Sequence, residues 1–150
     1  MQALVRLQNV AHRCYPRPIT RPVARVIEIA IRLVFQCYLP AAARVHPTVH
    51  FHHNGLAVLV NRLAEIGPGC QIGPQVVLGG RSPIRGAPCL HENVIVHSGA
   101  KLIGPITIGA GAVIGANAVV LCDVPAGATA VGVPARIIER PDRGAEAAAG

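Results

Sequence analysis

An apolar residue recurs at every sixth position from residue 66 to residue 126. Neither the period of about 3.6 residues of an α-helix nor the period of about two of a half-buried strand requires this spacing. A second, mostly smaller residue follows four positions after most members of the series. The two series are Ile66, Ile72, Leu78, Ile84, Leu90, Val96, Leu102, Ile108, Ile114, Val120 and Ala126, and Cys70, Val76, Val94, Ala100, Ile106, Ala112, Ala118, Val124 and Ala130. One large and one small inward side chain per six residues predict a mainly β fold, a parallel β-helix whose flat sides surround a narrow core.

The composition agrees with a narrow aliphatic core. Apolar residues make up 51% of the 150 residues and charged residues 14%, which excludes a disordered or strongly solvated chain. Aromatic residues make up only 3%, so Val, Ile, Leu and Ala are expected to fill the interior. A chain of this length favours a single domain that buries a core of its own.

Residues 1–44 are predicted to form an arm of two short amphipathic α-helices ahead of the coil. Polar residues recur at helical spacing in both, and the prolines of the linker 15–19 separate them. Thr20 and Pro22 predict the start of the second helix, and Pro40 predicts its end. The polar stripes are Gln2, Arg6, Asn9 and Arg13 in the first helix and Arg21, Arg25, Glu28 and Arg32 in the second. We expect the opposite, apolar faces to cover the first turn of the coil, whose strand edge is otherwise unpaired.

The coil is predicted over residues 45–138, with one interruption and a tail. Gly, Pro and Arg are concentrated in residues 79–89, which indicates a loop that leaves the coil wall. Twelve residues separate Leu78 from Leu90, so this loop replaces hexads without shifting their phase. Such excursions usually belong to the binding face of a solenoid. Residues 139–150 are expected to form a flexible tail.

The positive charge is concentrated in the arm. Fourteen basic and seven acidic residues give a net charge of +7, and residues 1–45, with seven Arg and one Glu, carry +6 of it. Solvated helix faces explain this charge, and so does an anionic partner such as a membrane surface, so peripheral membrane contact stays open. Nucleic acid is not expected, because the arm offers only three aromatic residues for base stacking. Residues 23–39 are apolar but too short and too charged to span a membrane.

The five cysteines predict reduced thiols. They lie far apart in the sequence, form no C-x-x-C pair and are odd in number. A secretory signal peptide is not expected, because Arg6 interrupts the short apolar start. A cytoplasmic protein without disulfides is the interpretation that fits best.

Three strings in the coil carry a family resemblance. They are Gly-Ala-Lys-Leu-Ile-Gly (99–104), Ile-Gly-Ala-Gly-Ala-Val-Ile-Gly-Ala-Asn-Ala-Val-Val-Leu (108–121) and Gly-Val-Pro-Ala-Arg-Ile-Ile (132–138). With them, residues 45–138 resemble the bacterial serine acetyltransferase branch of the left-handed β-helix acyltransferases. The resemblance implies a three-sided, left-handed coil, a homotrimer, and acetyl-CoA as a co-substrate along the groove between neighbouring coils.

The resemblance also implies which residues hold acetyl-CoA. Coil walls present backbone N–H and C=O groups to an extended pantetheine arm, and small residues permit its close approach. The small residues are Gly99, Ala100, Ala116 and Ala118, which corner and core geometry alone would also explain. Lys101 and Arg136 are expected to bind the CoA phosphates through charge-assisted hydrogen bonds.

Acetyl transfer to a hydroxyl requires a base, most often His, that accepts the hydroxyl proton. In the family this base lies in an Asp-His-x-x-Gly element, to which the stretch of residues 51–57, Phe-His-His-Asn-Gly-Leu-Ala, corresponds. Aligned without a gap, Asn54 takes the position of the base, whereas a slip of one residue puts His53 there. We expect His53 to be the base and His52 the alternative, because neighbouring residues of a strand point to opposite faces.

The loop leaves the acceptor open. Where the family has an Arg-His pair before a Pro, this chain has Gly86 and Ala87, so the residues that hold serine are largely missing. Arg81 and Arg85 either orient an acidic acceptor or the nucleotide, or are solvated. We predict an acetyl-CoA-dependent O-acetyltransferase that resembles serine O-acetyltransferase and transfers acetyl directly to a small-molecule hydroxyl. A sugar or polysaccharide O-acetyltransferase and a non-catalytic trimeric β-helix scaffold are the alternatives.

No metal is expected. Related coils hold zinc through three His in γ-class carbonic anhydrases, but His91 and His97 occupy adjacent sides of a turn. Stacked positions in a three-sided coil lie eighteen residues apart, and these positions are Gly here. A complex with cysteine synthase is not expected either, because the chain ends in Gly rather than the Ile that engages that enzyme in the family.

Overall fold

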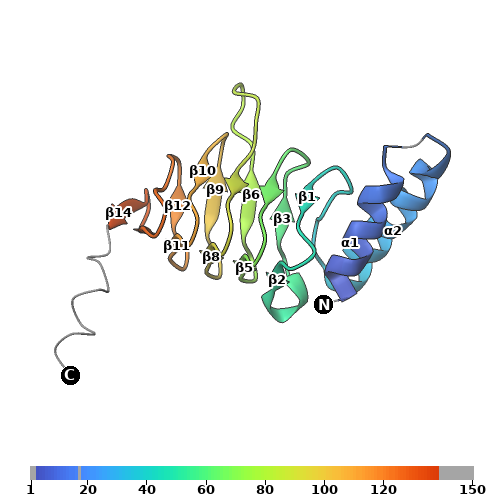
Figure 1. The fold of residues 1–150 in the computed structure, drawn as a ribbon, viewed down its shortest axis with the longest axis horizontal. Helices are drawn as coiled ribbons and strands as arrows, with labels where there is room; N and C mark the ends of the chain where they lie inside the picture. Colours follow the sequence, from blue (N-terminus) through green and yellow to red (C-terminus); the bar gives the residue numbers. More distant parts are fainter. Residues whose placement is uncertain (1–2, 17, 139–150) are drawn as a thin grey trace.

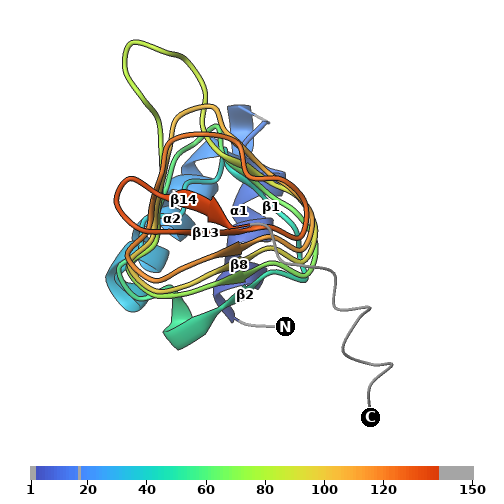
Figure 2. The same ribbon diagram turned by 90° about the vertical axis from the view of Figure 1, so that its left-hand side faces the viewer.

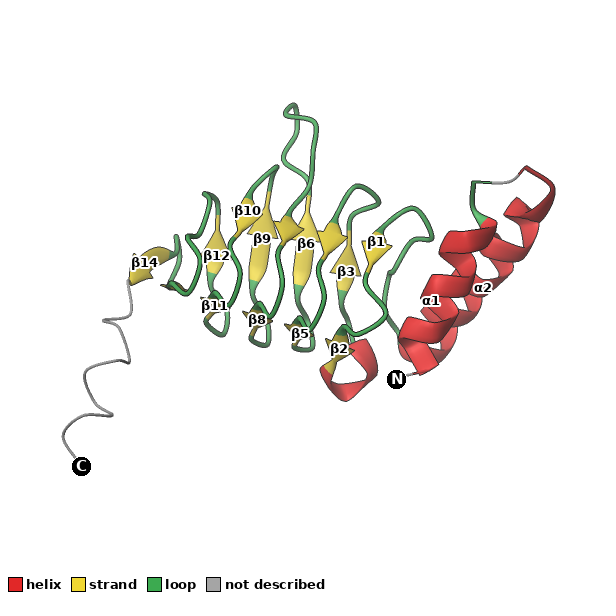
Figure 3. Cartoon of the chain, viewed as in Figure 1, coloured by secondary structure: helices red, strands yellow, loops and turns green. Residues whose placement is uncertain are grey.

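The computed structural model describes residues 3–16 and 18–138 as a coil of parallel β-strands with two helices at one end (Figure 1). The predicted tail, residues 139–150, lies outside the described residues. The helices and the last strand lie at opposite ends of an elongated molecule (Figure 3).

Two helices cover the N-terminal end of the coil, as predicted. They are α1 (Ala3–Cys14) and α2 (Arg21–Phe35), with the 3₁₀ turn η1 (Pro18–Thr20) between them. Leu4 and Val5 of α1 are buried in the core that the first coil turn shares. The buried Gln8 side chain donates from Nε2 to the carbonyl oxygens of Pro40 (3.0 Å) and Ala43 (3.3 Å). These bonds fasten α1 to the segment that enters the coil.

The second helix, α2, packs mainly on α1. Ala24 lies against Ala11 and Ala41, while Ile31 reaches the main core. Glu28 accepts a hydrogen bond on Oε1 from the Ala41 N–H at 2.6 Å. Most other aliphatic side chains of α2 are exposed, so the expectation that its apolar face covers the coil holds for only a small part of that face. Among the described residues, neither helix is long and apolar enough to cross a bilayer.

Short strands build three sheets that wrap around one axis (Figure 2). In chain order they are β1 (Arg44–Val45), β2 (His50–Phe51), β3 (Leu59–Val60), β4 (Glu65–Ile66), β5 (Gln71–Ile72), β6 (Val77–Gly79), β7 (Cys89–Leu90), β8 (Ile95–Val96), β9 (Lys101–Ile103), β10 (Thr107–Ile108), β11 (Val113–Ile114), β12 (Val119–Val120), β13 (Thr129–Val131) and β14 (Arg136–Ile138). The sheet orders are β1-β4-β7-β10, β2-β5-β8-β11-β13-β14 and β3-β6-β9-β12. Pairing is parallel except between β13 and β14.

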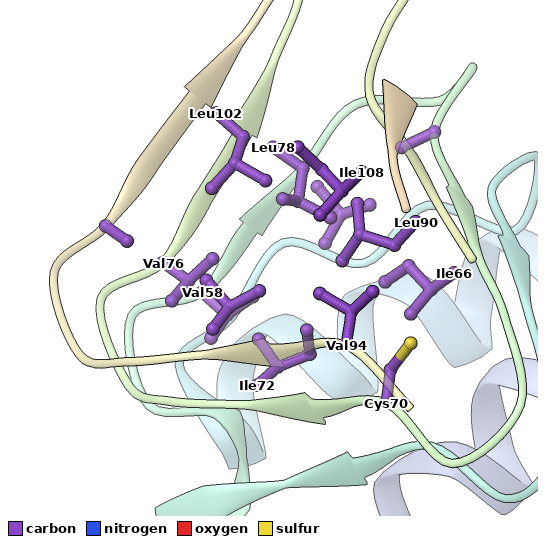
Figure 4. Packing of buried hydrophobic residues seen from close by; sticks show 14 of the residues in the cluster. Val58, Ile66, Cys70, Ile72, Val76, Leu78, Leu90, Val94, Leu102 and Ile108 are labelled. Atoms are coloured by element: carbon purple, nitrogen blue, oxygen red, sulfur yellow. The ribbon is translucent and has the colours of Figure 1, made fainter. Parts of the chain in front are cut away.

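Both predicted series of inward residues fill the core, with two exceptions. Figure 4 shows members of both series, among them Ile66, Cys70 and Leu90, pointing into the interior of the coil. Ile84 is instead 52% exposed on the loop, where it forms an antiparallel bridge with Arg81. Ala126 is exposed as well. The prediction that these two residues point inward is therefore wrong.

Turn lengths explain the exceptions. Residues 101 and 119 pair across a regular turn of 18 residues, 51 and 72 across a turn of 21, 66 and 90 across a turn of 24, and 114 and 130 across a turn of 16. The turn with the loop is thus six residues longer than a regular turn. Because six is one full repeat, the spacing in the sequence continues through Ile84, although Ile84 lies on the loop and not in the wall. The last turn is two residues short, so Ala128 and Ala130 take the inward positions and Ala126 lies on the surface.

Two edges of the coil carry most of the predicted functional residues. The β2–β3 corner comprises the segments 52–58, 73–76, 97–100 and 115–118 that link the second sheet to the third. The β3–β4 corner comprises 61–64, 80–88, 104–106 and 121–123. At the β2–β3 corner, the first turn of the coil is longer than the others and forms the 3₁₀ turn η2 (His52–Gly55). At the β3–β4 corner, residues 80–88 form the predicted loop. Seen along the axis, η2 and the loop project from different edges (Figure 2).

Candidate functional site

The predicted catalytic residues lie in the tight turn η2 rather than on an extended strand. His53 and Asn54 have left-handed backbone conformations, with φ of 50° and 55°, and Gly55 follows with φ of 72°. His, Asn and Gly are the residue types that tolerate this region best. Gly55 also lies tight against α1, because a Cβ there would meet Leu4 Cδ2 at 2.8 Å. The alternation of strand side chains, on which the choice between His53 and His52 depended, therefore does not apply here.

The two histidines are both exposed but differ in their surroundings. His52 Nε2 lies 3.3 Å from Gln71 Oε1, and the His52 ring contacts the His50 ring edge-on with 4.7 Å between centroids. The His53 ring has no hydrogen-bond partner among the described residues. His52 is thus held in one orientation, whereas His53 can turn toward a bound molecule.

Sequence reasoning missed Gln71 and His50 as neighbours of the candidate base. A regular turn of 18 residues would stack Gln71 on position 53. The three additional residues of η2 shift the pairing, so Gln71 pairs with His50. The sequence carries no signal for this contact, because His52 lies in η2, where the alternation of strand side chains does not apply.

A column of backbone hydrogen bonds runs along the β2–β3 corner. These bonds run from the Gln75 N–H to the Leu56 carbonyl oxygen (2.9 Å), from the Gly99 N–H to that of Pro74 (2.9 Å), and from the Asn117 N–H to that of Ser98 (3.0 Å). Neighbouring parallel strands are about 4.8 Å apart, so Gly99 lies about 10 Å along the axis from η2. The predicted base, His53, and the predicted acetyl-CoA residues around Gly99 therefore lie on the same edge of the coil.

The predicted acetyl-CoA residues on this edge differ in exposure. Gly99, Ala100 and Ala118 are buried, and the methyl groups of the two alanines belong to the core. Ala116 is exposed. Lys101 extends from β9, and its Nζ donates to the Gly99 carbonyl oxygen at 3.0 Å, which holds the ammonium at the corner. The edge therefore offers backbone, one small exposed side chain and one cation.

The three predicted arginines lie away from η2. Arg136 is exposed on β14, at the far end of the sheet that begins with β2, where it pairs with Val131. Arg81 and Arg85 are exposed on the loop at the β3–β4 corner. Arg81 lines a hollow there together with Leu121. Within one chain, the structure does not bring the loop arginines next to η2.

His91 and His97 are exposed and follow β7 and β8, respectively, at different corners of the coil. Over residues 3–16 and 18–138, no group of three or more His, Cys, Asp and Glu side chains is arranged to hold a metal ion.

The cysteines differ in burial, and burial raises the pKa of three of their thiols. Burial raises the pKa of Cys37 to about 11 and also raises the pKa of Cys70, whose Sγ donates to the His91 carbonyl oxygen at 2.9 Å. Burial and the Glu65 carboxylate raise the pKa of Cys89. Cys122 is exposed. None of these raised values suits a thiolate nucleophile, which requires a lowered pKa.

We expect iodoacetamide at about pH 8 to alkylate Cys122 well before Cys37 or Cys70. With a pKa of about 11, only on the order of one Cys37 thiol in a thousand is ionised at that pH. Peptide mass spectrometry after partial alkylation measures the order. The same experiment in urea is the control, because unfolding should make all five rates similar; equal rates in the native protein would contradict the burial described here.

Comparison with known proteins adds three findings. The bacterial transferase hexapeptide family, described by six repeats, matches residues 90–122. A serine acetyltransferase of Synechococcus elongatus is 38% identical over 93% of this chain and 57% of its own length. A serine acetyltransferase of Helicobacter pylori is 36% identical over 79% of this chain and 70% of its own length. The chain thus spans little more than half the length of the Synechococcus relative.

Solved structures agree. A serine acetyltransferase in complex with CoA has a TM-score of 0.82 and 33% identity, covering 90% of this chain and 56% of its own. Soybean serine acetyltransferase in complex with serine has a TM-score of 0.82 and 37% identity, with the same coverage. This agreement, together with the three sheets, confirms the predicted fold class, a left-handed parallel β-helix with two short N-terminal helices.

Proposed function

Because the chain belongs to the serine acetyltransferase family of hexapeptide-repeat transferases, we propose that it moves the acetyl group of acetyl-CoA to a hydroxyl of a small molecule. The observation that carries the proposal is similarity along nearly the whole chain, at 38% identity over 93% of it. This span includes both η2 and the turns around Gly99. One solved relative contains CoA and another contains serine, which are a donor product and an acceptor of this reaction class.

The donor is proposed to lie along the β2–β3 corner. Acetyl-CoA needs a surface where its extended arm can approach the backbone closely, and at the positions of Gly99, Ala100, Ala116 and Ala118 only the small methyl group of Ala116 is exposed. Lys101 supports the proposal because its ammonium is already at the corner, 3.0 Å from the Gly99 carbonyl oxygen. Arg136, exposed on β14 at the C-terminal end of the coil, is the second proposed phosphate ligand.

His53 is proposed as the base. The acceptor oxygen attacks the thioester carbonyl carbon, the base accepts the hydroxyl proton, and the CoA thiolate leaves. A base needs an unengaged nitrogen that reaches the acceptor, and the exposed His53 ring meets that requirement better than His52, which already contacts Gln71. Asn54 completes the turn and is proposed to orient the acceptor rather than to accept its proton.

The site is proposed to be completed by a neighbouring chain in a homotrimer. Arg81 and Arg85 project from a different edge than η2, so they can meet an acceptor at η2 only if the loop of one chain reaches the β2–β3 corner of the next. An arginine there would favour an acceptor that carries a carboxylate. We assign the reaction to the cytoplasm, in agreement with five cysteines that form no disulfide in the described chain.

The test is an acceptor screen with acetyl-CoA. The purified chain is incubated with acetyl-CoA and either L-serine, a panel of sugars or no acceptor, and free CoA is separated by chromatography and quantified. We expect acceptor-dependent CoA release with L-serine. Chromatographic detection avoids thiol reagents, which would also react with Cys122.

Each other outcome selects a different function. Release only with sugars would replace serine by a glycan hydroxyl, which the half-buried Gly86 and Ala87 in the loop favour because they lack the side chains that hold serine in the family. No release with any acceptor, while the protein still binds CoA or assembles, would mean a scaffold and overturn the proposal. Measuring CoA binding by calorimetry alongside the screen separates a missing donor site from a missing acceptor.

A further inference from the structure

The outward face of α2 is apolar and uncovered among the described residues. The exposed aliphatic side chains are Val23, Val26, Ile29, Leu33 and Val34 of α2 and Ile19 of η1. Leu33 and Val34 are 74% and 73% exposed, and Val26 is 65% exposed. At about 100° per residue, Val26, Ile29 and Leu33 project opposite the buried Ala24 and Ile31. Contiguous exposed apolar surface of this kind marks an interaction site.

Cations border this face on one side. Arg21, Arg25 and Arg32 are exposed and lie together on the helix surface between the buried stripe and the apolar face. The only carboxylate of α2, Glu28, is engaged with the Ala41 N–H at 2.6 Å and lies on the α1 side of the helix. The surface that α2 presents outward is therefore apolar and basic, without an acidic group.

This charge pattern distinguishes between two occupants. If a second copy of this chain covered the face with its α2 antiparallel, the arginine row of one α2 would lie beside that of the other, and like charges would oppose without a carboxylate to pair with. An anionic bilayer suits both features, since the aliphatic face enters the boundary between headgroups and acyl chains while Arg side chains reach the lipid phosphates. The observations therefore favour the bilayer.

We propose that α2, with Ile19, docks the protein on the surface of an anionic membrane. Figure 1 shows that the two helices form one end of the elongated molecule, so docking is not obstructed by the coil. The turn η2 lies beside this end, because Gly55 contacts Leu4 of α1. Docking through α2 therefore brings the lipid surface to the same end of the molecule as η2. This inference does not depend on the proposed function.

Vesicle flotation tests the proposal with the full chain. The probes are vesicles of phosphatidylcholine alone and of phosphatidylcholine mixed with phosphatidylglycerol. We expect binding to the anionic vesicles that weakens as salt is added, with at least about tenfold weaker binding to neutral ones. Equal binding to both, or binding to neither, would overturn the proposal.

Variants separate the apolar face from the arginine row. The double variant Val26→Ser, Leu33→Ser is expected to reduce binding to anionic vesicles at least about tenfold, because it removes the centre of the apolar face. Arg25→Gln and Arg32→Gln are each expected to reduce it about fivefold. The matched control is Val133→Ser, an equally exposed aliphatic residue (71%) near the opposite end of the coil, which should bind as the wild type does.

Oligomeric state provides the opposing outcome. Sedimentation of the wild type and of the Val26→Ser, Leu33→Ser variant without lipid shows whether the face joins two copies. If the wild type forms an assembly that the variant does not form, and the variant binds anionic vesicles with the affinity of the wild type, a second copy is the occupant and the membrane proposal is wrong. If the assembly is unchanged and vesicle binding is lost, the proposal holds.

Discussion

Replacing His53 by Asn is expected to lower the turnover number for acetyl transfer at least about a hundredfold, the usual scale for loss of a general base. Asn is preferred to Ala because His53 has φ of 50°, a left-handed conformation that costs an ordinary side chain about 1–2 kcal/mol but that Asn adopts readily. The variant therefore removes the basic nitrogen without straining η2. Steady-state kinetics at saturating acetyl-CoA and acceptor measure the change.

Two control variants make the result specific. His91→Asn alters an exposed histidine at a different corner of the coil and should leave turnover unchanged. His52→Asn removes the contact with Gln71 and should have a smaller effect, through looser positioning of the turn. If His52→Asn abolishes activity and His53→Asn does not, His52 is the base. Unchanged turnover in both variants would remove η2 from the chemistry altogether.

Replacing Leu90 by Ala is expected to lower the free energy of unfolding by about 2–5 kcal/mol, whereas Ile84→Ala should lower it by less than about 1 kcal/mol. The two residues are neighbours in the six-residue series, but Leu90 is 2% exposed in the core and Ile84 is on the loop. Truncating Leu90 leaves a cavity that the surrounding aliphatic residues fill only in part. Truncating Ile84 removes a side chain that already contacts water.

Urea unfolding followed by circular dichroism measures both changes. Protein concentration is held constant throughout, because association of subunits would add to the apparent stability. Equal losses in the two variants would mean that Ile84 is packed inward, and would restore the uninterrupted series that the sequence alone suggested.

The core was predictable because packing imposes the spacing directly. In each side of the coil one large aliphatic residue, such as Leu102 or Ile114, points inward at a fixed position of its hexad, so the period appears in the sequence without any knowledge of pairing. Ile84 and Ala126 are exceptions because their six-residue spacing in the sequence does not correspond to an inward position in the wall of the coil. A loop that adds six residues preserves the count through Ile84, and a turn that is two residues short shifts the phase after Val120.

The candidate site was only partly predictable, because it lies where the coil is irregular. Sequence strings identified the corner that holds Gly99 and the turn that holds His53, and the structure brings both to one edge. The contact of His52 with Gln71 depends on a register that only the three additional residues of η2 determine. The direction in which α2 presents its aliphatic face was equally hidden, since aliphatic residues occur on both sides of that helix.

The antiparallel strand β14 affects whether these molecules can associate end to end at high concentration. A coil of parallel rungs could in principle polymerise end to end, one molecule adding its strands to the open rim of the next. Here β14 runs antiparallel to β13, with Arg136 opposite Val131, and occupies the edge on which another rung of that sheet would grow. At the other end, α1 is fastened over the first rung through Gln8. Both ends of the coil are therefore covered by segments of the same chain, which disfavours end-to-end assembly into fibres.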